Sequence, residues 1–438
     1  MSKKFADTPS KRFFKLSAMS ARVAGSYASS KIRQAFSDED DKGQAQSLLY
    51  SEIGEQVMQT LGEMKGAAMK MGQVASQLQH VLPAEFTEQI AKLQQHSPPM
   101  PFAVIEKQIQ NELGFLPAQL FAHFDVQPFA AASIGQVHKA TTHDGREVVL
   151  KVQYPGVYQS CRSDLVHLKR IFTLSGLFKV DKSVMDALFA QIEAQLMDEL
   201  DYKKEAHNLQ EFGEFHSDNA KVIIPQVIDE FSTERVLCLS YEPGEHIADL
   251  RSAGYSQEQI NTAAVNLVSA ILQELLYHLR VHCDPHPGNF AFRKDGSVII
   301  YDYGAVTNVE DLVIDQYIEL ATAALNQEFE AIDGLLLKLG VRNPVAAEVS
   351  PQLYQKWYKE FIQPALDEVR PKQILAKVQP AIKNNMKEMM ALRGAFQPTT
   401  TTIFINRVLG GLFLNLAQMD TDVDFKPIIL SHVFEETN

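Results

Sequence analysis

The pattern of apolar and polar positions divides the chain into a helical first part, a strand-rich middle and a long helical last part. Residues 44–96 are rich in Ala, Met, Leu and Gln and contain no proline before Pro83, which is typical of helices. The segment 97–101 then contains three prolines and marks the clearest boundary in the chain. We therefore expect a first domain over residues 1–100.

The middle of the chain is expected to form a small sheet with one helix. A turn-forming Asp-Gly pair separates the alternating runs 137–142 and 148–152, an arrangement that predicts a β-hairpin. A helix and two shorter strands are predicted further along, over residues 183–215, 222–224 and 236–239. A proline and a glycine within 242–244 break the chain, so the second domain is predicted to cover 101–241.

The last domain, 242–438, is expected to be mainly helical. Its most apolar stretches, 261–281 and 402–419, are interrupted by polar residues such as Glu274 and Arg407. Neither stretch reaches the run of about 18 apolar residues that a membrane helix needs. We therefore expect buried helices there, and a cleft between the last two domains would be a natural ligand site.

Composition excludes several classes of protein. The 438 residues are 45% hydrophobic and 22% charged, which is ordinary for a packed globular protein and excludes disorder for most of the chain. The 3 cysteines are too few and too scattered for a disulfide framework or a zinc motif, so a reducing compartment is expected. The net charge of -13 argues against nucleic-acid binding, which needs a basic surface.

The N-terminal segment departs from this acidic balance. Residues 1–35 hold eight Lys and Arg residues against the single acidic Asp7, together with apolar side chains such as Phe13 and Leu16. A basic amphipathic segment can lie on an anionic membrane surface. It can equally be a transit peptide or a packed terminal helix with a solvated basic face, and the sequence leaves these three interpretations open.

The strongest chemical signal lies between residues 282 and 304. Asp284 and Asn289 are five residues apart, and Asp302 follows 13 residues later, after an apolar strand and two residues before a glycine. Phosphoryl transfer from ATP needs a carboxylate near the acceptor and oxygen ligands for Mg²⁺, and kinases supply them at these spacings. We therefore predict that Asp284 is the base or orients the acceptor, and that Asn289 and Asp302 bind Mg²⁺.

The same segment has a second interpretation, a metal site formed by His282, Asp284 and His286. No further cluster of His or Cys in the sequence supports that site. His282 is better explained as a structural histidine that holds the loop. The agreement of three spacings with the kinase pattern makes the phosphoryl-transfer interpretation the preferred one.

A lysine upstream fits the phosphate-binding side of the same chemistry. Lys151 ends an apolar strand, where kinases place the lysine that contacts the α- and β-phosphates. A glycine-rich phosphate loop is expected one hairpin earlier, but this chain retains only Gly135 there. The residues that occupy that loop, and that we predict to bind the nucleotide, are Ala130, Ala131, Ala132 and Ser133. Each added Cβ limits the approach of the backbone to phosphates, so ATP binding should differ from that of an ordinary protein kinase.

The lysine needs an acidic partner, and the predicted helix over 183–215 offers several. The candidates are Glu193, Glu199, Asp201 and Glu205. Asp201 and Glu205 are four residues apart and would share one face of that helix. We expect Glu205 to pair with Lys151, which makes both residues part of the predicted catalytic set.

Two features of protein kinases are missing. Cys283 stands where protein kinases carry an arginine before the catalytic aspartate, so a docking group for a phosphorylated activation loop is lacking. No Ala-Pro-Glu motif follows Gly304, and residues 308–325 read directly as helix. A platform for peptide substrates is therefore not expected.

Together these motifs resemble the UbiB/AarF/ADCK family of atypical kinase-like proteins. The opening Thr8-Pro9-Ser10-Lys11-Arg12, with the small-residue helix expected after it, is similar to the coenzyme Q-linked branch of that family. The most specific element is Lys70-Met71-Gly72-Gln73, which matches the family's KxGQ motif and lies in the helical first domain. The alanine-rich loop at 130–133 and Glu199-Leu200-Asp201, the ExD motif, agree as well. The resemblance covers nearly the whole chain.

The resemblance implies an α+β, bilobal protein-kinase-like fold with the N-terminal helical extension packed over the active-site cleft. It implies that Lys70 lies near the carboxylates of Glu199 and Asp201 and that Gln73 lies near the nucleotide. Such a plug would occlude a protein substrate. The predicted regulatory set is therefore Lys70, Gly72, Gln73, Glu199 and Asp201, and Ser240 and Tyr241 join the predicted nucleotide-binding set.

The expected function is that of an atypical kinase-like ATPase with ATP and Mg²⁺ as cofactors, supporting ubiquinone biosynthesis or related membrane-lipid metabolism. The expected partners are an anionic membrane surface and quinone-biosynthesis proteins or lipids. A cytoplasmic location is expected, with a peripheral position at the inner membrane as the alternative. Two other functions stay open: a nucleotide-gated pseudokinase scaffold or lipid-handling factor with little turnover, and a conventional phosphotransferase.

Overall fold

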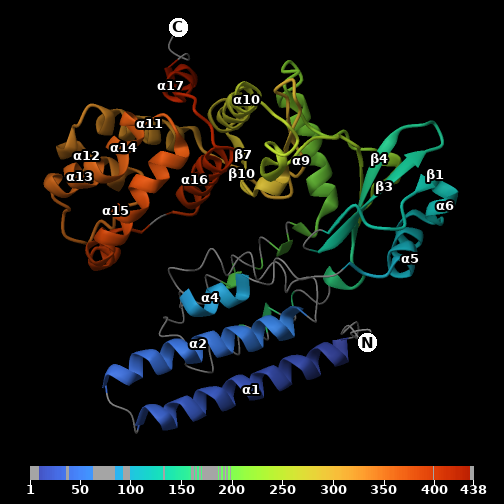
Figure 1. The fold of residues 1–438 in the computed structure, drawn as a ribbon, viewed down its shortest axis with the longest axis horizontal. Coiled ribbons are helices and arrows are strands. Elements are labelled where there is room, and N and C mark those ends of the chain that lie inside the picture. Colours follow the sequence, from blue (N-terminus) through green and yellow to red (C-terminus); the bar gives the residue numbers. More distant parts are fainter. Residues whose placement is uncertain are drawn as a thin grey trace. The chain divides into compact units, whose positions relative to one another are not determined.

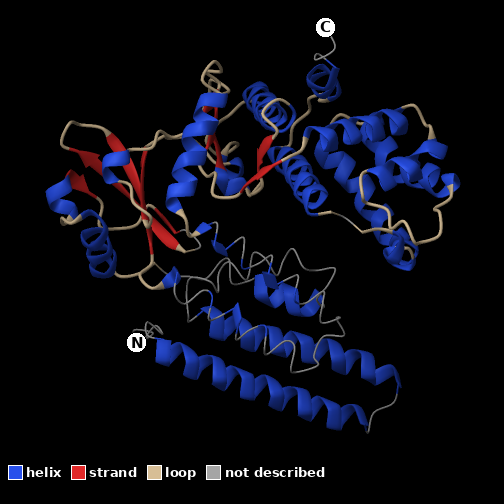
Figure 2. Ribbon diagram, turned by 180° about the vertical axis from the view of Figure 1, so that it is seen from behind, coloured by secondary structure: helices blue, strands red, loops and turns tan. Residues whose placement is uncertain are grey.

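The computed structural model describes residues 9–35, 39–62, 84–91, 99–131, 134–158, 199–397 and 399–434, with isolated positions between 162 and 197 (Figure 1). The chain forms two compact units. One unit contains Met1–Ala206 and Val227–Tyr241, and the other contains His207–Gln226 and Glu242–Asn438. Helices and strands both contribute to the fold, as Figure 2 shows by colour, so the predicted α+β class is confirmed.

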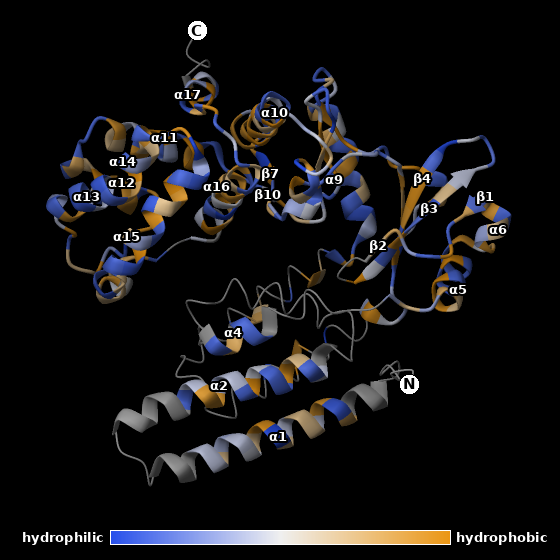
Figure 3. Ribbon diagram, in the orientation of Figure 1, coloured by the Kyte–Doolittle hydropathy of each residue, from blue (hydrophilic) through white to orange (hydrophobic). Residues whose placement is uncertain are grey.

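The first unit begins with three helices, α1 (Pro9–Ala35), α2 (Glu39–Gly62) and α4 (Ala84–Ala91). Apolar residues recur every three or four positions along α1 and α2 (Figure 3), which gives each helix one apolar face. The buried members of these faces are Leu16, Met19, Val23, Leu49, Ile53 and Val57. Because α1 packs on α2, and α2 on α4, this arrangement favours the packed terminal helix among the three interpretations of residues 1–35.

The same unit contains a five-stranded antiparallel sheet with the order β1-β3-β4-β6, in which β2 pairs with β3. Its strands are β1 (Phe121–Phe124), β2 (Ala130–Ala131), β3 (Gly135–Thr142), β4 (Glu147–Gln153) and β6 (Val236–Ser240). The β3–β4 pair is the predicted hairpin, and its turn uses Gly145 at a φ of 87°, a left-handed conformation that favours glycine. Two helices precede the hairpin, α5 (Phe102–Leu113) and α6 (Pro117–Leu120).

The helix predicted over 183–215 is interrupted in the structure. The chain leaves the helical conformation at Leu200 and Asp201, and α9 (Tyr202–Phe215) begins directly after them. Asp201 Oδ1 accepts hydrogen bonds of 3.1 Å from the backbone N–H groups of Lys203 and Lys204, so it caps the new helix. The prediction that Asp201 shares a helix face with Glu205 was therefore wrong, because an aspartate at this position satisfies helix N–H groups instead.

The second unit is mainly helical and contains five short strands among the described residues, one at 222–223 and the others between 280 and 308. The helices are α10 (Gln257–Leu276), α11 (Asp311–Leu325), α12 (Phe329–Lys338), α13 (Pro351–Trp357), α14 (Gln363–Asp367), α15 (Pro371–Ala391), α16 (Thr400–Met419) and α17 (Lys426–Phe434). The strands are β5 (Val222–Ile223), β7 (Arg280–His282), β8 (Phe290–Phe292), β9 (Val298–Ile300) and β10 (Val306–Asn308). β8 and β5 flank β9, and β7 pairs with β10.

The two most apolar stretches of the sequence form α10 and α16. Ser256 caps α10 by accepting a hydrogen bond from the backbone of Gln259, and the helix is buried along much of its length. Asn406 and Arg407 interrupt the apolar run in α16, as expected for a helix of a packed domain. Among the residues that the structure describes, no helix is both long enough and apolar enough to cross a membrane.

Candidate functional site

The first group of predicted site residues is an ion pair on the sheet. Lys151 lies on β4, between β3 and β6, and its Nζ is 2.7 and 2.9 Å from the two carboxylate oxygens of Glu205. Glu205 belongs to the first turn of α9, and its side chain is only 2% exposed, against 18% for Lys151. The structure thus brings together the lysine and the glutamate that the sequence analysis paired. A charge-assisted contact of this length holds the ammonium group in one place.

Lys151 lies on the less covered face of the sheet. In the β3–β4 register Lys151 is opposite Val137 and Val149 is opposite Lys139, so these four side chains share a face. All four are half-buried, whereas Leu150, which points to the other face, is completely buried. The half-buried face is therefore the one that can accept a ligand within this unit.

The alanine-rich loop is described only in part. Ala130–Ala131 forms β2, whereas Ala132 and Ser133 lie outside the described residues. A Cβ built on Gly135 would lie 2.3 Å from the carbonyl oxygen of Val152. The close approach of β3 to β4 therefore requires a glycine at this position, whatever contact the loop makes with phosphates.

Ser240 and Tyr241 lie at the end of β6, beside β4. The backbone N–H of Tyr241 donates to the carbonyl of Glu147 at 3.0 Å, which continues the pairing of the two strands. Lys139 Nζ donates to the Tyr241 hydroxyl at 2.7 Å and is 4.2 Å from the ring centroid of Phe129. Tyr241 therefore lies on the same sheet face as Lys139 and Lys151.

The second group of predicted site residues follows β7 in the other unit. Asn289 Nδ2 donates to the backbone carbonyl of Asp284 at 3.0 Å, so the two residues fix the loop between them. His286 Nδ1 accepts a hydrogen bond of 3.1 Å from the N–H of Gly288 within that loop. Because the amide nitrogen of Asn289 is used for the loop, its Oδ1 is the atom left to act as a ligand.

Helix α16 supports this loop from 123 residues further along the chain. Arg407 Nη2 lies 3.5 Å from Asp284 Oδ1, and Asn415 Nδ2 donates to the carbonyl of Pro285 at 3.0 Å. Between them, a Cβ on Gly411 would lie 2.1 Å from Pro285. Residues 407, 411 and 415 are four apart, so a single face of α16 contacts the loop.

Asp302 follows β9 and is held by its own turn. Its Oδ1 accepts a hydrogen bond of 2.7 Å from the N–H of Gly304, which fixes the direction of the carboxylate. Asn208 on α9 donates to the carbonyl of Tyr303 at 2.8 Å. Cys283 is buried beside this region, and burial raises the pKa of its thiol. A buried thiol with a raised pKa is a poor nucleophile, so we assign it no catalytic role.

The donors in this unit fit Mg²⁺ better than a metal held by protein alone. In the described parts of the chain no group of three or more His, Cys, Asp or Glu side chains is arranged to hold a metal ion. Asn289 and Asp302 supply an amide oxygen and a carboxylate, and Mg²⁺ commonly takes few protein ligands together with phosphate oxygens. The alternative histidine site gains no support, because His282 is buried against Tyr303, with the two ring centroids 5.2 Å apart.

Only two of the five predicted regulatory residues, Glu199 and Asp201, belong to the described part of the chain. Lys70, Gly72 and Gln73 lie outside the described residues. Glu199 is half-buried just before Leu200, and Asp201 caps α9. The placement of the extension over a cleft stays a prediction.

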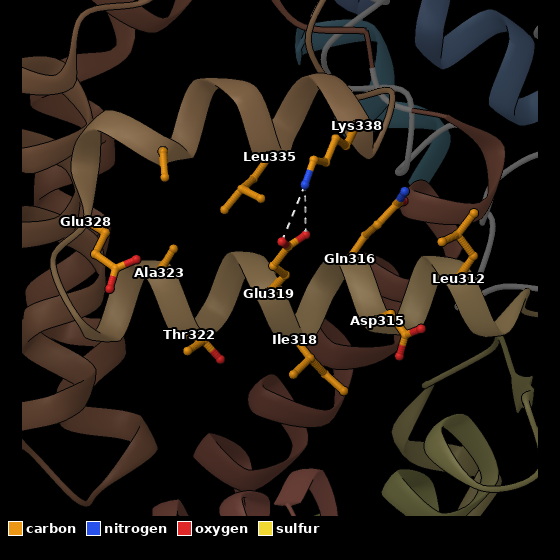
Figure 4. Close-up of a pocket in the computed structure, with 11 residues that line it drawn as sticks. Leu312, Asp315, Gln316, Ile318, Glu319, Thr322, Ala323, Glu328, Leu335 and Lys338 are labelled. Atoms are coloured by element: carbon orange, nitrogen blue, oxygen red, sulfur yellow. Dashed lines mark hydrogen bonds and ion pairs between the residues drawn. The ribbon is translucent and has the colours of Figure 1, made fainter.

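An open pocket of about 610 Å³ lies elsewhere, between α11 and α12 (Figure 4). Glu319 and Lys338 face each other across it at 3.4 Å, and Leu312 and Leu335 add apolar surface. No residue that the sequence analysis predicted for the site lines this pocket. It therefore adds nothing to the candidate site.

Sequence reasoning missed the residues that support the predicted ones. Arg407 was noted only as an interruption of an apolar run, although a charge in such a run can signal a buried partner. Glu274, on α10, was noted in the same way, and the structure shows it hydrogen-bonded to Tyr303. Neither contact can be derived from spacing, because each joins a helix to a distant loop.

Comparison with known proteins identifies the family to which the chain is similar. The model of the ABC1 atypical kinase-like domain matches residues 92–336. The atypical kinase COQ8, mitochondrial, of Saccharomyces cerevisiae is 30% identical over 384 residues, which cover 86% of this chain and 75% of that protein. The probable serine/threonine-protein kinase abkA of Dictyostelium discoideum is 26% identical over 463 residues, covering 98% and 80% of the two chains.

A solved structure agrees over most of the chain. The complex of Rv3197 with erythromycin from Mycobacterium tuberculosis has a TM-score of 0.59 and 26% sequence identity, and the match covers 90% of this chain and 98% of that chain. The matched domain spans more than half of the 438 residues and the likeness to COQ8 spans most of both proteins. The chain therefore belongs to the ABC1 atypical kinase-like family, the UbiB/AarF/ADCK family that its motifs resemble, and has that family's kinase-like fold.

Proposed function

We propose that this protein is an atypical kinase-like ATPase that binds Mg-ATP and supports ubiquinone biosynthesis or related membrane-lipid metabolism. The observation that carries the proposal is the ion pair between Lys151 and Glu205 on the half-buried face of the sheet. An ammonium group that is held by a buried carboxylate is positioned to receive phosphate oxygens, which is its role in kinases.

The metal side of the proposal rests on Asn289 and Asp302. Their oxygens would hold Mg²⁺, which when bound neutralises charge on the phosphate oxygens. Gly304 N–H fixes the Asp302 carboxylate, and the carbonyl of Asp284 fixes the Asn289 amide. These hydrogen bonds orient both ligands before the nucleotide arrives, which reduces the ordering that binding requires.

The acceptor side rests on Asp284. Its carboxylate would accept a proton from, or orient, the hydroxyl or water that attacks the γ-phosphorus, while ADP leaves. We also propose roles in nucleotide binding for the 130–133 loop and for Ser240 and Tyr241. Lys70, Gly72 and Gln73, together with Glu199 and Asp201, are proposed to regulate the site.

The cellular setting is proposed from the relatives. One of them is named the mitochondrial atypical kinase COQ8, which supports a role near coenzyme Q. We propose quinone-biosynthesis proteins or lipids and an anionic membrane surface as partners, in the cytoplasm or peripherally at the inner membrane.

A second candidate function is a nucleotide-gated scaffold with little turnover. The contact between Arg407 and Asp284 favours it, because the guanidinium lies against a carboxylate oxygen that would otherwise contact the attacking hydroxyl or water. In that case nucleotide binding would change the conformation without frequent hydrolysis. Measurement of turnover separates the two candidates.

The test is release of inorganic phosphate from Mg-ATP by the purified protein, with and without anionic liposomes. Asp302→Asn is the matched control, because it preserves size and removes the metal-binding charge. Turnover above that of the control supports the ATPase, and stimulation by liposomes supports work at a membrane. Binding of ATP without turnover would favour the scaffold, and absence of binding would contradict both.

A further inference from the structure

The residue after Asp302 is anchored by a hydrogen bond inside the mainly helical second unit, His207–Gln226 with Glu242–Asn438, which we call the helical unit. Tyr303 is completely buried, and its hydroxyl donates to Glu274 Oε1 at 2.7 Å. Its ring lies against Phe212, with the centroids 4.1 Å apart. A phenylalanine could fill the same apolar space, so packing alone does not explain the hydroxyl group.

Glu274 is an unusual residue for its position. It lies on α10 among buried apolar residues, and none of its side chain is exposed. His216 Nε2 is 3.2 Å from the same Oε1 atom, whereas Oε2 has no hydrogen-bond partner among the described residues. Burying a carboxylate is costly unless hydrogen bonds compensate, so the contacts with Tyr303 and His216 are what keep it in place.

One face of α9 completes the anchor. Asn208, Phe212 and His216 are four residues apart, so they lie on one side of the helix or just beyond its end. Asn208 donates to the Tyr303 carbonyl, Phe212 packs on its ring, and His216 contacts Glu274. Both the backbone and the side chain of Tyr303 are thereby fixed.

We propose that Glu274, together with His216, is a positioning site for Asp302 that acts through Tyr303. The inference rests on the proposed function, because it assumes that Asp302 binds Mg²⁺. The hydrogen bond gives Tyr303 a single position that apolar packing alone does not specify, and the peptide that joins the two residues passes this restraint to Asp302. Glu274 and His216 themselves need not touch the nucleotide.

The test compares Mg²⁺ dependence in variants of the full chain. The concentration of Mg²⁺ that gives half-maximal ATP binding is measured by titration calorimetry, together with the affinity for ATP in excess chelator. Tyr303→Phe and Glu274→Leu each remove the anchor, and we expect them to raise the half-maximal Mg²⁺ concentration about threefold to tenfold. Binding of ATP without Mg²⁺ should not change.

Two further variants separate positioning from general stability. Glu274→Gln keeps a side-chain oxygen that can accept the hydrogen bond from the Tyr303 hydroxyl. Its half-maximal Mg²⁺ concentration should therefore stay close to that of the wild type. Tyr354→Phe removes a comparable hydroxyl-to-carboxylate hydrogen bond, to Asp333 on α12, away from Asp302. That control should lower the melting temperature and leave Mg²⁺ dependence unchanged.

The outcomes are distinct. If Tyr303→Phe lowers the melting temperature as Tyr354→Phe does, with the same Mg²⁺ dependence as the wild type, the anchor is structural only and the inference fails while the proposed function stands. If ATP binding by the wild type does not depend on Mg²⁺, or Asp302→Asn does not weaken it, the proposed function fails and the positioning role fails with it.

Discussion

The two units of the molecule hold their catalytic candidates in different ways. In the first unit, which contains the five-stranded sheet and which we call the sheet unit, Lys151 Nζ lies 2.7 and 2.9 Å from the two carboxylate oxygens of Glu205. That carboxylate is almost completely buried. In the helical unit Arg407 and Asp284 are 3.5 Å apart, and each side chain is about a quarter exposed, at 23% and 25%.

We call Lys151 with Glu205 the fixed ion pair and Arg407 with Asp284 the replaceable ion pair. A short pair with a buried partner is lost only at a high cost, because the remaining charge is left without compensation. A long and partly exposed pair contributes little free energy, so a substrate or a cation can displace it. We infer that Lys151, the proposed phosphate-binding residue, is held in place before ligands bind, whereas Asp284, the proposed acceptor-orienting residue, can be released from Arg407 by a ligand.

The largest expected effect comes from breaking the fixed pair. Lys151→Met removes the ammonium group that pairs with the buried Glu205 and should lower the free energy of unfolding by about 3 kcal/mol, measured by urea denaturation. Arg146→Met is the control, because Arg146 forms exposed ion pairs with Asp144 and Glu230 on the same sheet unit. Its cost should stay below about 1 kcal/mol. Equal costs for the two variants would contradict the description of a fixed pair.

The next effect concerns the contact between α16 and the loop at Pro285. Gly411→Ala introduces a Cβ 2.1 Å from Pro285 and should cost about 2 kcal/mol, since either the helix or the loop must move. The adjacent Gly410 has nothing within 4 Å of its Cβ position, so Gly410→Ala should stabilise the helix by about 0.5 to 1 kcal/mol. Thermal denaturation of both variants measures the contrast. A stabilising Gly411→Ala would show that this face of α16 does not pack on the loop.

Breaking the replaceable pair should have a smaller effect. Arg407→Met retains most of the apolar stem of the side chain and removes the charge next to Asp284. We expect a loss of about 1 kcal/mol or less in the free energy of unfolding, because the pair is long and partly exposed. Urea denaturation beside Lys151→Met provides the comparison, and a loss as large as that of Lys151→Met would remove the distinction between the pairs.

The two units should also differ in their response to acid. His138 lies in the buried face of the sheet, and burial lowers its pKa below the ordinary value of 6.5, although a hydrogen bond to Asp125 opposes that shift. Because the folded form binds the proton less well than the unfolded form, this stabilisation is complete above pH 6.5 and is lost as the pH falls through the lower folded pKa.

In the helical unit, the stabilisation that Asp333 contributes is also lost as the pH falls, but at a lower pH. Burial raises the pKa of Asp333, but hydrogen bonds from Arg342 and Tyr354 lower it by more, so it lies below 3.8. Its contribution is therefore lost only as the pH falls below 3.8 and through the folded pKa. Hydrogen exchange followed from pH 7 to pH 5 should show loosening of the sheet first. In His138→Asn this early loosening should disappear, and its persistence would assign it to another group.

The features that could be predicted from the sequence are those whose residues lie close together in the chain. The hairpin and the pairing of Lys151 with Glu205 were predictable, because a strand pattern, a turn pair and a helix with four acidic candidates all lie within the 69 residues from 137 to 205. The spacing of Asp284, Asn289 and Asp302 was equally local. Local patterns of this kind survive folding because the residues belong to one strand, turn or loop.

The supporting contacts were not predictable from one sequence. Arg407 and Glu274 reach their partners through tertiary packing of α16 and α10, and no periodicity relates a helix face to a loop so far away in the chain. The break at Asp201 is different in kind. An aspartate two and three residues before the N–H groups that it caps is a recognised start signal, and the strongly helical composition around it concealed that signal.

The most direct test of the account is stabilisation by nucleotide in the presence of Mg²⁺. The melting temperature of the wild type is measured with ATP and Mg²⁺, with ATP in chelator and without ligand, beside Lys151→Met and Asp302→Asn. A ligand at 100 times its dissociation constant stabilises a folded protein by about 2.7 kcal/mol, so a clear upward shift is expected for the wild type. The account predicts that Asp302→Asn loses the Mg²⁺-dependent part of this shift and that Lys151→Met loses most of the whole. An unchanged shift in both variants would contradict the assignment of these residues to a Mg-ATP site.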